Sequence, residues 1–218
     1  MRMRKKPNLP ARLGKCEHLL VAEPESLRSR WLDEFLYDEL YVELGCGKGR
    51  FTVDMAKAEP EKLIVAIEKS LSAMIIALEL AVTEKLQNIR FVNALADSVI
   101  EYFEPGEVSR IFLNFCDPWP ANRHAKRRLT HRRFLELYKQ ILRLGGEILF
   151  KTDNLPLFDF SLREFERCGF TLVDVRRDLH KDSPDGIMSD YEMKFYCQGQ
   201  PIYYAHAALN ATCASEES

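Results

Sequence analysis

The chain has 218 residues and a formal net charge of -2, and 46% of its residues are hydrophobic, enough to bury the core of one α/β domain. Its six cysteines form no C-x-x-C pair, so neither a zinc ribbon nor a thioredoxin motif is indicated, and a reducing cytoplasmic location is expected. No apolar run reaches the length of a membrane span, so we expect no membrane association.

Positive charge gathers in two places although the total is slightly acidic. Cations occur at residues 2–6 and again at 123–133, and no apolar segment follows the first cluster as a secretory signal would require. Local basic patches indicate a nucleic-acid partner better than the net charge does. The sequence predicts a single domain over 1–218, with a basic N-terminal extension at 1–35 and a frayed tail at 210–218.

The first half of the chain alternates short apolar runs with helical patterns. A helix is expected at 51–60, stopped by Pro60, and a longer one at 70–85, with Ser70 as its N-cap. Short apolar runs predict strands at 40–44, 63–67, 89–92 and 110–115.

The second half continues the alternation. Thr130 is the expected N-cap of a helix that ends at Gly145 and Gly146, and Asn154 opens another that Gly169 closes. Strands are expected at 147–151, 171–175 and 191–197. The order predicts a parallel α/β sheet with helices on both faces, and the last two strands lack an obvious helix between them, so one is expected to be antiparallel.

In such sheets the ligand lies beyond the carboxyl ends of the strands, where this chain places acids. The glycine loop after the first strand, VELGCGKGRF, has glycines at 45, 47 and 49, but Arg50 stands where the dinucleotide pattern needs its third glycine. Glu68 follows the loop in the sequence at the spacing expected for an acid whose carboxylate accepts both hydroxyls of a ribose. Glu43, directly before the loop, would attract the sulfonium of S-adenosylmethionine and repel the pyrophosphate of NAD. The loop therefore favours S-adenosylmethionine over NAD, with a plain tight turn as the remaining interpretation.

A rigid corner, Asp117-Pro118-Trp119-Pro120, directly precedes the second basic cluster. A fixed carboxylate and a flat ring beside cations suit an extruded base with its phosphates, whereas a proline turn with a core tryptophan is the alternative. Cys116 is expected to be a buried strand cysteine, not a nucleophile, because no histidine clearly activates it.

Further acids could accept hydrogen bonds from the N–H donors along the edge of a guanine base. Asp153 ends a predicted strand and could instead be a helix-capping acid, and Ser189 to Glu192 precede the last apolar run. The segments that carry a family resemblance are the basic start, the glycine loop, NFCDPWP, RHAKRRLT, FKTDN, DYEMKF and GQPIYYA. Through them, nearly the whole chain resembles the bacterial tRNA (guanine-N7)-methyltransferases.

The resemblance implies a Rossmann-like class I methyltransferase fold with a mostly parallel seven-stranded sheet, tRNA as partner, S-adenosylmethionine as cofactor, and no metal. It implies transfer of a methyl group to N7 of a guanine in the tRNA variable loop, by a monomer or homodimer without an obligate protein partner. It assigns catalysis to Asp117, and cofactor binding to Glu43, Gly45, Gly47, Glu68, Leu95 and Asp117. It assigns substrate binding to Asp153, Ser189, Asp190, Tyr191 and Glu192, and RNA binding to Arg123, His124, Ala125, Lys126, Arg127 and Arg128.

Three positions depart from the family pattern. Leu95 stands where the family has an acid or amide near the adenine of the cofactor. Any contact of residue 95 with the adenine must therefore come from its backbone, or Asn93 or Asp97 must make the contact instead. Ala121 replaces a lysine, and Ser189 replaces a threonine. A non-catalytic RNA-binding protein and an NAD-dependent oxidoreductase remain the competing functions.

Overall fold

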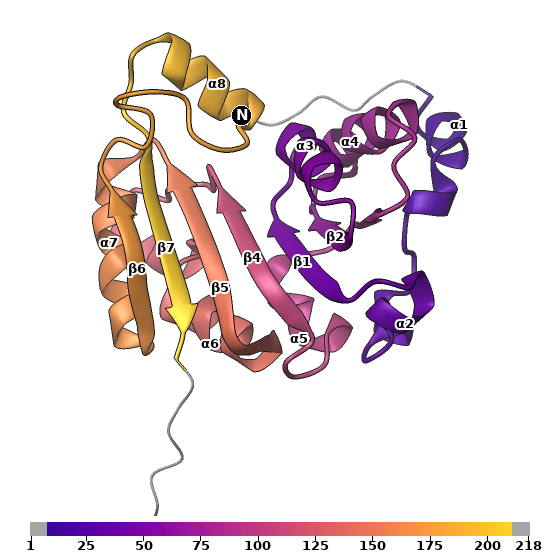
Figure 1. Ribbon diagram of the computed structural model, residues 1–218, viewed down its shortest axis with the longest axis horizontal. Helices are drawn as coiled ribbons and strands as arrows, with labels where there is room; N and C mark the ends of the chain where they lie inside the picture. Colours follow the sequence, from indigo (N-terminus) through magenta and orange to yellow (C-terminus); the bar gives the residue numbers. More distant parts are fainter. Residues whose placement is uncertain (1–7, 211–218) are drawn as a thin grey trace, which may run out of the picture.

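The computed structural model describes residues 8–210. The predicted cations at 2–6 and the predicted tail from residue 211 onward lie outside the described residues. Over the described range the strands form one seven-stranded sheet in the order β3-β2-β1-β4-β5-β7-β6 (Figure 1). Their bounds are β1 Glu39–Leu44, β2 Lys62–Ile67, β3 Ile89–Val92, β4 Val108–Asn114, β5 Leu142–Thr152, β6 Phe170–Arg176 and β7 Tyr203–Leu209.

The first five strands pair in parallel, and β7 is antiparallel to both β5 and β6. This confirms the predicted sheet, including its late antiparallel strand. The helices are α1 Leu9–Gly14, α2 Trp31–Phe35, α3 Arg50–Ala58, α4 Leu71–Thr83, α5 Val99–Tyr102, α6 Arg132–Ile141, α7 Leu155–Arg167 and α8 Asp190–Cys197.

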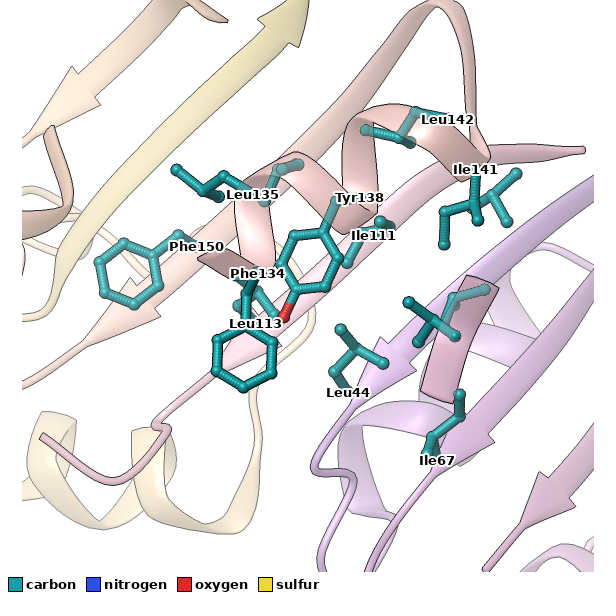
Figure 2. Close-up of a cluster of buried hydrophobic side chains, with 14 of the residues drawn as sticks. Leu44, Ile67, Ile111, Leu113, Phe134, Leu135, Tyr138, Ile141, Leu142 and Phe150 are labelled. Atoms are coloured by element: carbon teal, nitrogen blue, oxygen red, sulfur yellow. The ribbon is translucent and has the colours of Figure 1, made fainter. Parts of the chain in front are cut away.

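Two apolar cores lie on opposite faces of the sheet. One contains residues of α5, α6 and α7, and Figure 2 shows its centre, where Leu135 and Tyr138 of α6 lie close to Ile111 of β4 and Phe150 of β5. The other contains residues of α3 and α4 packed on β1, β2 and β3. Helices therefore cover both faces, as the alternating pattern predicted.

The N-terminal extension is part of the domain over residues 8–35. The Trp31 side chain is fully buried, and its indole Nε1 donates a hydrogen bond to the Tyr102 carbonyl at 2.9 Å. The Arg12 guanidinium donates two hydrogen bonds of 2.6 Å to the Glu79 carboxylate on α4. The extension is thus anchored at both ends of this stretch.

The predicted limits of the helix after Thr130 are wrong. His131 is the N-cap of α6, and its ring accepts from the Arg133 amide, whereas the Thr130 hydroxyl lies 2.6 Å from the Ser161 hydroxyl. The helix ends at Ile141 because β5 already begins at Leu142 and pairs with Val108. Gly145, at φ +72°, lies in a bulge of β5 between that pair and the pairing of Arg110 with Glu147.

The predicted strand at 191–197 is also wrong, because these residues form α8. The apolar residues alternate there, which favoured a strand, but the Ser189 hydroxyl accepts from the Glu192 amide and the Glu192 carboxylate accepts from the Ser189 amide. This capping box starts a helix. The final strand, β7, begins at Tyr203, twelve residues after the predicted start at residue 191, because the chain first completes α8.

Candidate active site

A cleft opens beyond the carboxyl ends of β1, β2 and β4. Its larger cavity, about 570 Å³, and its smaller one, about 260 Å³, share a boundary formed by Gly45, Gly47, Lys48, Phe115 and Tyr191. The larger cavity is lined further by the ends of β2 and β3 and by the corner after β4. The smaller cavity lies between the glycine loop and the start of α8.

The glycine loop holds the Glu68 carboxylate in place. Glu68 accepts a hydrogen bond from the Gly47 amide at 3.1 Å and another from the Ser70 amide at 2.7 Å. Gly49 has φ +78°, and a Cβ atom there would lie 2.3 Å from the Ala77 Cβ on α4. Glycine at 49 therefore allows α3 and α4 to pack closely, while Gly45 and Gly47 form cleft wall.

Glu43 lies at the smaller cavity with its carboxylate inside the protein. The side chain accepts hydrogen bonds from the Thr52 hydroxyl and, at 3.1 Å, from the Asn114 amide group. Burial raises the pKa of Glu43 to about 7, although both hydrogen bonds oppose that shift. The predicted direct attraction of a cationic cofactor is therefore weakened, because this acid is partly protonated near neutral pH.

Asp117 has the opposite environment. The strand β4 ends at Asn114, Phe115 has φ +50°, and the Asp117 side chain is 69% exposed at the wall of the larger cavity. The Lys69 ammonium lies 3.7 Å from the Asp117 carboxylate. Cys116 also lies beyond the strand, so its predicted strand position is wrong, and burial of its thiol raises the pKa to about 12. A thiol with that pKa is no nucleophile at neutral pH.

The basic segment divides into two groups. Arg128 is buried and donates hydrogen bonds of 3.0 Å to the carbonyls of Pro118 and Trp119, and its contact with RNA stays a prediction. The Arg127 guanidinium stacks 4.8 Å over the Trp119 ring. The exposed cations of the 3₁₀ turn η4 Asn122–Arg127 are Arg123, Lys126 and Arg127, while His124 and Ala125 are half-buried.

The residues predicted to lie near the adenine of the cofactor are Leu95, Asn93 and Asp97. Leu95 lines the larger cavity and is 58% exposed, so only its apolar side chain and its backbone face the cleft. The Asn93 amide group donates to the Glu68 carbonyl at 2.7 Å, which occupies it inside the fold. Asp97 lines the cavity and pairs with Arg133 of α6.

The predicted substrate residues are not all brought together. Ser189, Asp190 and Tyr191 line the smaller cavity, and the Tyr191 ring stacks on Phe115 with 6.5 Å between centroids. Asp153 is exposed after β5 but lines neither cavity. Glu192 is fully buried, with Lys151 Nζ at 2.8 Å, and lines neither cavity, so its direct substrate contact stays a prediction.

Sequence reasoning missed Lys48, Lys69 and Phe115 as residues of the cleft. Phe115 read as the last residue of a strand, and nothing in the pattern signals its positive φ. Lys69 follows Glu68 directly, so its place at a strand end was a usable signal. Within residues 8–210 no group of three or more metal-binding side chains gathers, and none of the helices described there is long and apolar enough to cross a membrane.

Comparison with known proteins identifies a matching family and several relatives of this chain. Residues 38–205 match the family described as putative methyltransferase. The chain is 42% identical over 211 residues to a tRNA (guanine-N(7)-)-methyltransferase of Exiguobacterium sp., covering 96% of this chain and 98% of that one. It is 43% identical over 211 residues to the Streptococcus equi subsp. zooepidemicus protein of the same name, covering 96% and 100%.

Solved structures share the fold at lower identity. The 16S rRNA methyltransferase KamB has a TM-score of 0.65 and 17% identity, and the match covers 87% of this chain and 93% of KamB. A 16S rRNA methyltransferase from Catenulisporales acidiphilia, solved with its cosubstrate SAM, has a TM-score of 0.61 and 16% identity over 83% of this chain and 92% of that one. At these identities the likeness concerns the fold alone.

Proposed function

The chain belongs to the methyltransferase family matched by its residues 38–205, and from this premise we propose that it is a tRNA (guanine-N7)-methyltransferase. In this proposal a methyl group passes from S-adenosylmethionine to N7 of a guanine in the tRNA variable loop. The observation that carries the proposal is the joint position of Glu68, the glycine loop and the exposed Asp117 around one cavity of about 570 Å³. The curated relatives of the same name, at 42–43% identity, support it.

The residues at the larger cavity fit the cofactor. Glu68 is held by two backbone amides and leaves a carboxylate beside the cavity that can accept both hydroxyls of a ribose. We propose that Gly45 and Gly47 give the close backbone approach and that Leu95 covers the adenine. Glu43 would act from the smaller cavity. When bound, S-adenosylmethionine supplies a methyl group on a sulfonium.

Guanine N7 has an in-plane lone pair and no proton to lose, so the chain needs no general base for this transfer. The bond from N7 to the methyl carbon forms as the carbon–sulfur bond breaks, and the positive charge moves from sulfur to the purine. Asp117 is fixed at the cavity wall and favours that charge while it orients the base. Tyr191, stacked on Phe115, offers a flat surface beside the same cavity for the base.

The exposed cations Arg123, Lys126 and Arg127 lie next to the corner and are proposed to contact tRNA phosphates. Asp153 and Ser189 are kept as proposed substrate contacts, Asp153 for a part of the tRNA outside the two cavities. We propose one catalytic domain over 1–218 and a cytoplasmic location. Monomer and homodimer stay equal predictions. The intact cleft disfavours both the non-catalytic RNA-binding protein and the NAD-dependent oxidoreductase.

The test is methylation of an unmodified tRNA transcript with labelled S-adenosylmethionine, followed by mapping of the labelled base. We expect label on N7 of one guanine in the variable loop, detected by chain cleavage specific for N7-methylguanine. A transcript with adenine in place of that guanine is the matched control and should take no label. Label on a pyrimidine, or a wild-type protein that binds tRNA without transferring label, would refute the proposal.

A further inference from the structure

Three buried polar side chains form a network behind the wall of the smaller cavity. The Lys151 ammonium donates to the Glu192 carboxylate at 2.8 Å and to the Ile187 carbonyl at 2.9 Å. His180 Nε2 lies 2.9 Å from the same Glu192 oxygen. The side chains of Lys151, Glu192 and His180 are 9%, 0% and 2% exposed, so the charges face one another and not water.

The hydrogen bonds of His180 define its tautomer. Its Nδ1 accepts from the Asp185 amide at 3.1 Å, so in the neutral ring the proton is on Nε2 and is donated to Glu192. Glu192 thus receives one hydrogen bond from the end of β5 and one from the loop after β6. The two hydrogen bonds of Lys151, to Glu192 and to the Ile187 carbonyl, attach the segment at the start of α8 to the sheet, and His180 links the loop after β6 to α8.

The same helix forms part of the cleft through its other side chains. Tyr191 and Phe195 both stack on Phe115, with centroid separations of 6.5 Å and 6.0 Å. Asp190 and Tyr191 line the smaller cavity, and Tyr191 also reaches the larger one. Figure 1 shows α8 above the ends of the strands, joined to β6 by residues 177–189 and to β7 by the short connection 198–202. The position of α8 therefore shapes the wall of both cavities.

We propose that Lys151 and His180 are positioning residues for the transferase reaction, which act through Glu192 to hold α8 and its Tyr191 at the cleft. The part of this inference that concerns the reaction rests on the proposed function, whereas the attachment of α8 does not depend on it. None of the three side chains touches the substrate in this mechanism. A buried pair that loses one partner leaves an unpaired charge, so α8 should move to expose Glu192 when Lys151 is replaced.

A second trio of the same chemistry provides a matched control. Glu147, four residues before Lys151 on β5, accepts hydrogen bonds of 2.9 Å and 2.6 Å from Arg110, and His206 Nε2 lies 3.0 Å from it. This trio of cation, glutamate and histidine lies along the strands and lines neither cavity. Its loss should leave α8 in place.

The experiment compares Lys151→Met and Glu192→Gln with Arg110→Met and Glu147→Gln in the full chain. Hydrogen exchange of the free protein reports on α8 without tRNA or cofactor, and steady-state kinetics then separate kcat from KM for tRNA. We expect exchange within 187–198 to quicken about tenfold or more in the first two variants, with kcat/KM for tRNA lowered on the order of 10- to 100-fold. The two control variants should change neither by more than about threefold.

The double variant Lys151→Met/Glu192→Gln separates positioning from direct contact. It leaves no unpaired buried charge, and the glutamine oxygen can still accept from the Ser189 amide, so slow exchange in α8 and most of the turnover should return. If exchange recovers while turnover does not, Glu192 acts on the substrate directly and the proposal is overturned. Unchanged exchange in Lys151→Met would overturn it as well. A wild-type protein that transfers no methyl group to tRNA would refute the proposed function and leave the exchange result standing.

Discussion

The end of β1 and the corner after β4 each carry an acid predicted to face the ligand, and the two acids meet different surroundings. Glu43 is the second-last residue of β1, within its pairing with Phe112 of β4, and its carboxylate is enclosed by Thr52 and Asn114. Asp117 lies three residues beyond the end of β4 and is 69% exposed. Neighbouring strands thus end in one sealed and one open carboxyl group.

The difference shows that the position of an acid relative to its strand end decides its chemistry. Inside the strand, the side chain points into a packed layer and loses hydration, which raises its pKa. Beyond the strand, the positive φ of Phe115 and Trp119 turns the chain outward, and Arg128 binds the turned carbonyls. The open acid is therefore suited to the reaction, and the sealed acid to shaping the cavity beside it.

The largest effect should come from removing the open acid. Asp117→Ala is expected to lower the single-turnover rate by about 100- to 1,000-fold, because the charge on the purine loses its nearby carboxylate. Unfolding free energy should change by less than about 0.5 kcal/mol, since the side chain is exposed. Asp117→Asn is the control for shape. A near-normal single-turnover rate in both variants would contradict the role of Asp117.

Replacing the buried acid with Glu43→Gln should change the unfolding free energy of the protein more than the rate of methyl transfer. The folded pKa of Glu43 is about 7 and the ordinary value is 4.5, so the wild type loses stability as pH rises from about 4.5 to about 7. As the pH rises over that range, the unfolding free energy of Glu43→Gln should increase by up to about 3 kcal/mol relative to that of the wild type. Urea unfolding of both proteins at pH 4.5 and pH 8 measures the change. An equal difference at both pH values would show that Glu43 is not protonated in the fold.

The open corner itself can be loosened through Arg128. Arg128→Met removes the hydrogen bonds to the carbonyls of Pro118 and Trp119, each worth about 1.5–3 kcal/mol for a charged donor. We expect kcat to fall about tenfold and the fluorescence of Trp119 to change, while the fully buried Trp31 gives a constant background. A variant that loses tRNA affinity at unchanged kcat would instead place Arg128 in contact with RNA.

The smallest effect should come from the exposed cation two residues earlier. Lys126→Ala is expected to weaken tRNA binding a few-fold and to reduce the slope of log K against log salt by about 1. The single-turnover rate at saturating tRNA should stay the same, because Lys126 lines neither cavity. Filter binding at several salt concentrations provides the measurement. An unchanged slope would mean that Lys126 neutralises no phosphate.

The sequence predicted the mostly parallel sheet and placed β1, β2, β3 and β6 to within about a residue at each end, because apolar runs and glycines are local signals. It failed where a contact from a distant element decided the outcome. Residues 191–197 alternate like a strand, yet Lys151 and His180 draw Glu192 into the interior and the capping box makes a helix. Arg128 looked like any other cation of its run, and only the turned carbonyls of the corner distinguish it. The pairing of Lys151 with Glu192 joins residues 41 positions apart, and no local pattern encodes it. The capping box from Ser189 to Glu192 is in contrast a local signal of a helix start, which the apolar alternation outweighed in the prediction.

The position of β7 has a consequence for how the protein is made. This strand is the last one within residues 8–210, yet it lies between β5 and β6, which precede it (Figure 1). While the ribosome is still adding residues 203–209, β5 and β6 have no shared partner, and their unpaired edges are exposed to other nascent chains. The sheet, with the α8 segment that β7 follows, can close only after those residues emerge. Newly synthesised chains should therefore gain methyltransferase activity in a single late step.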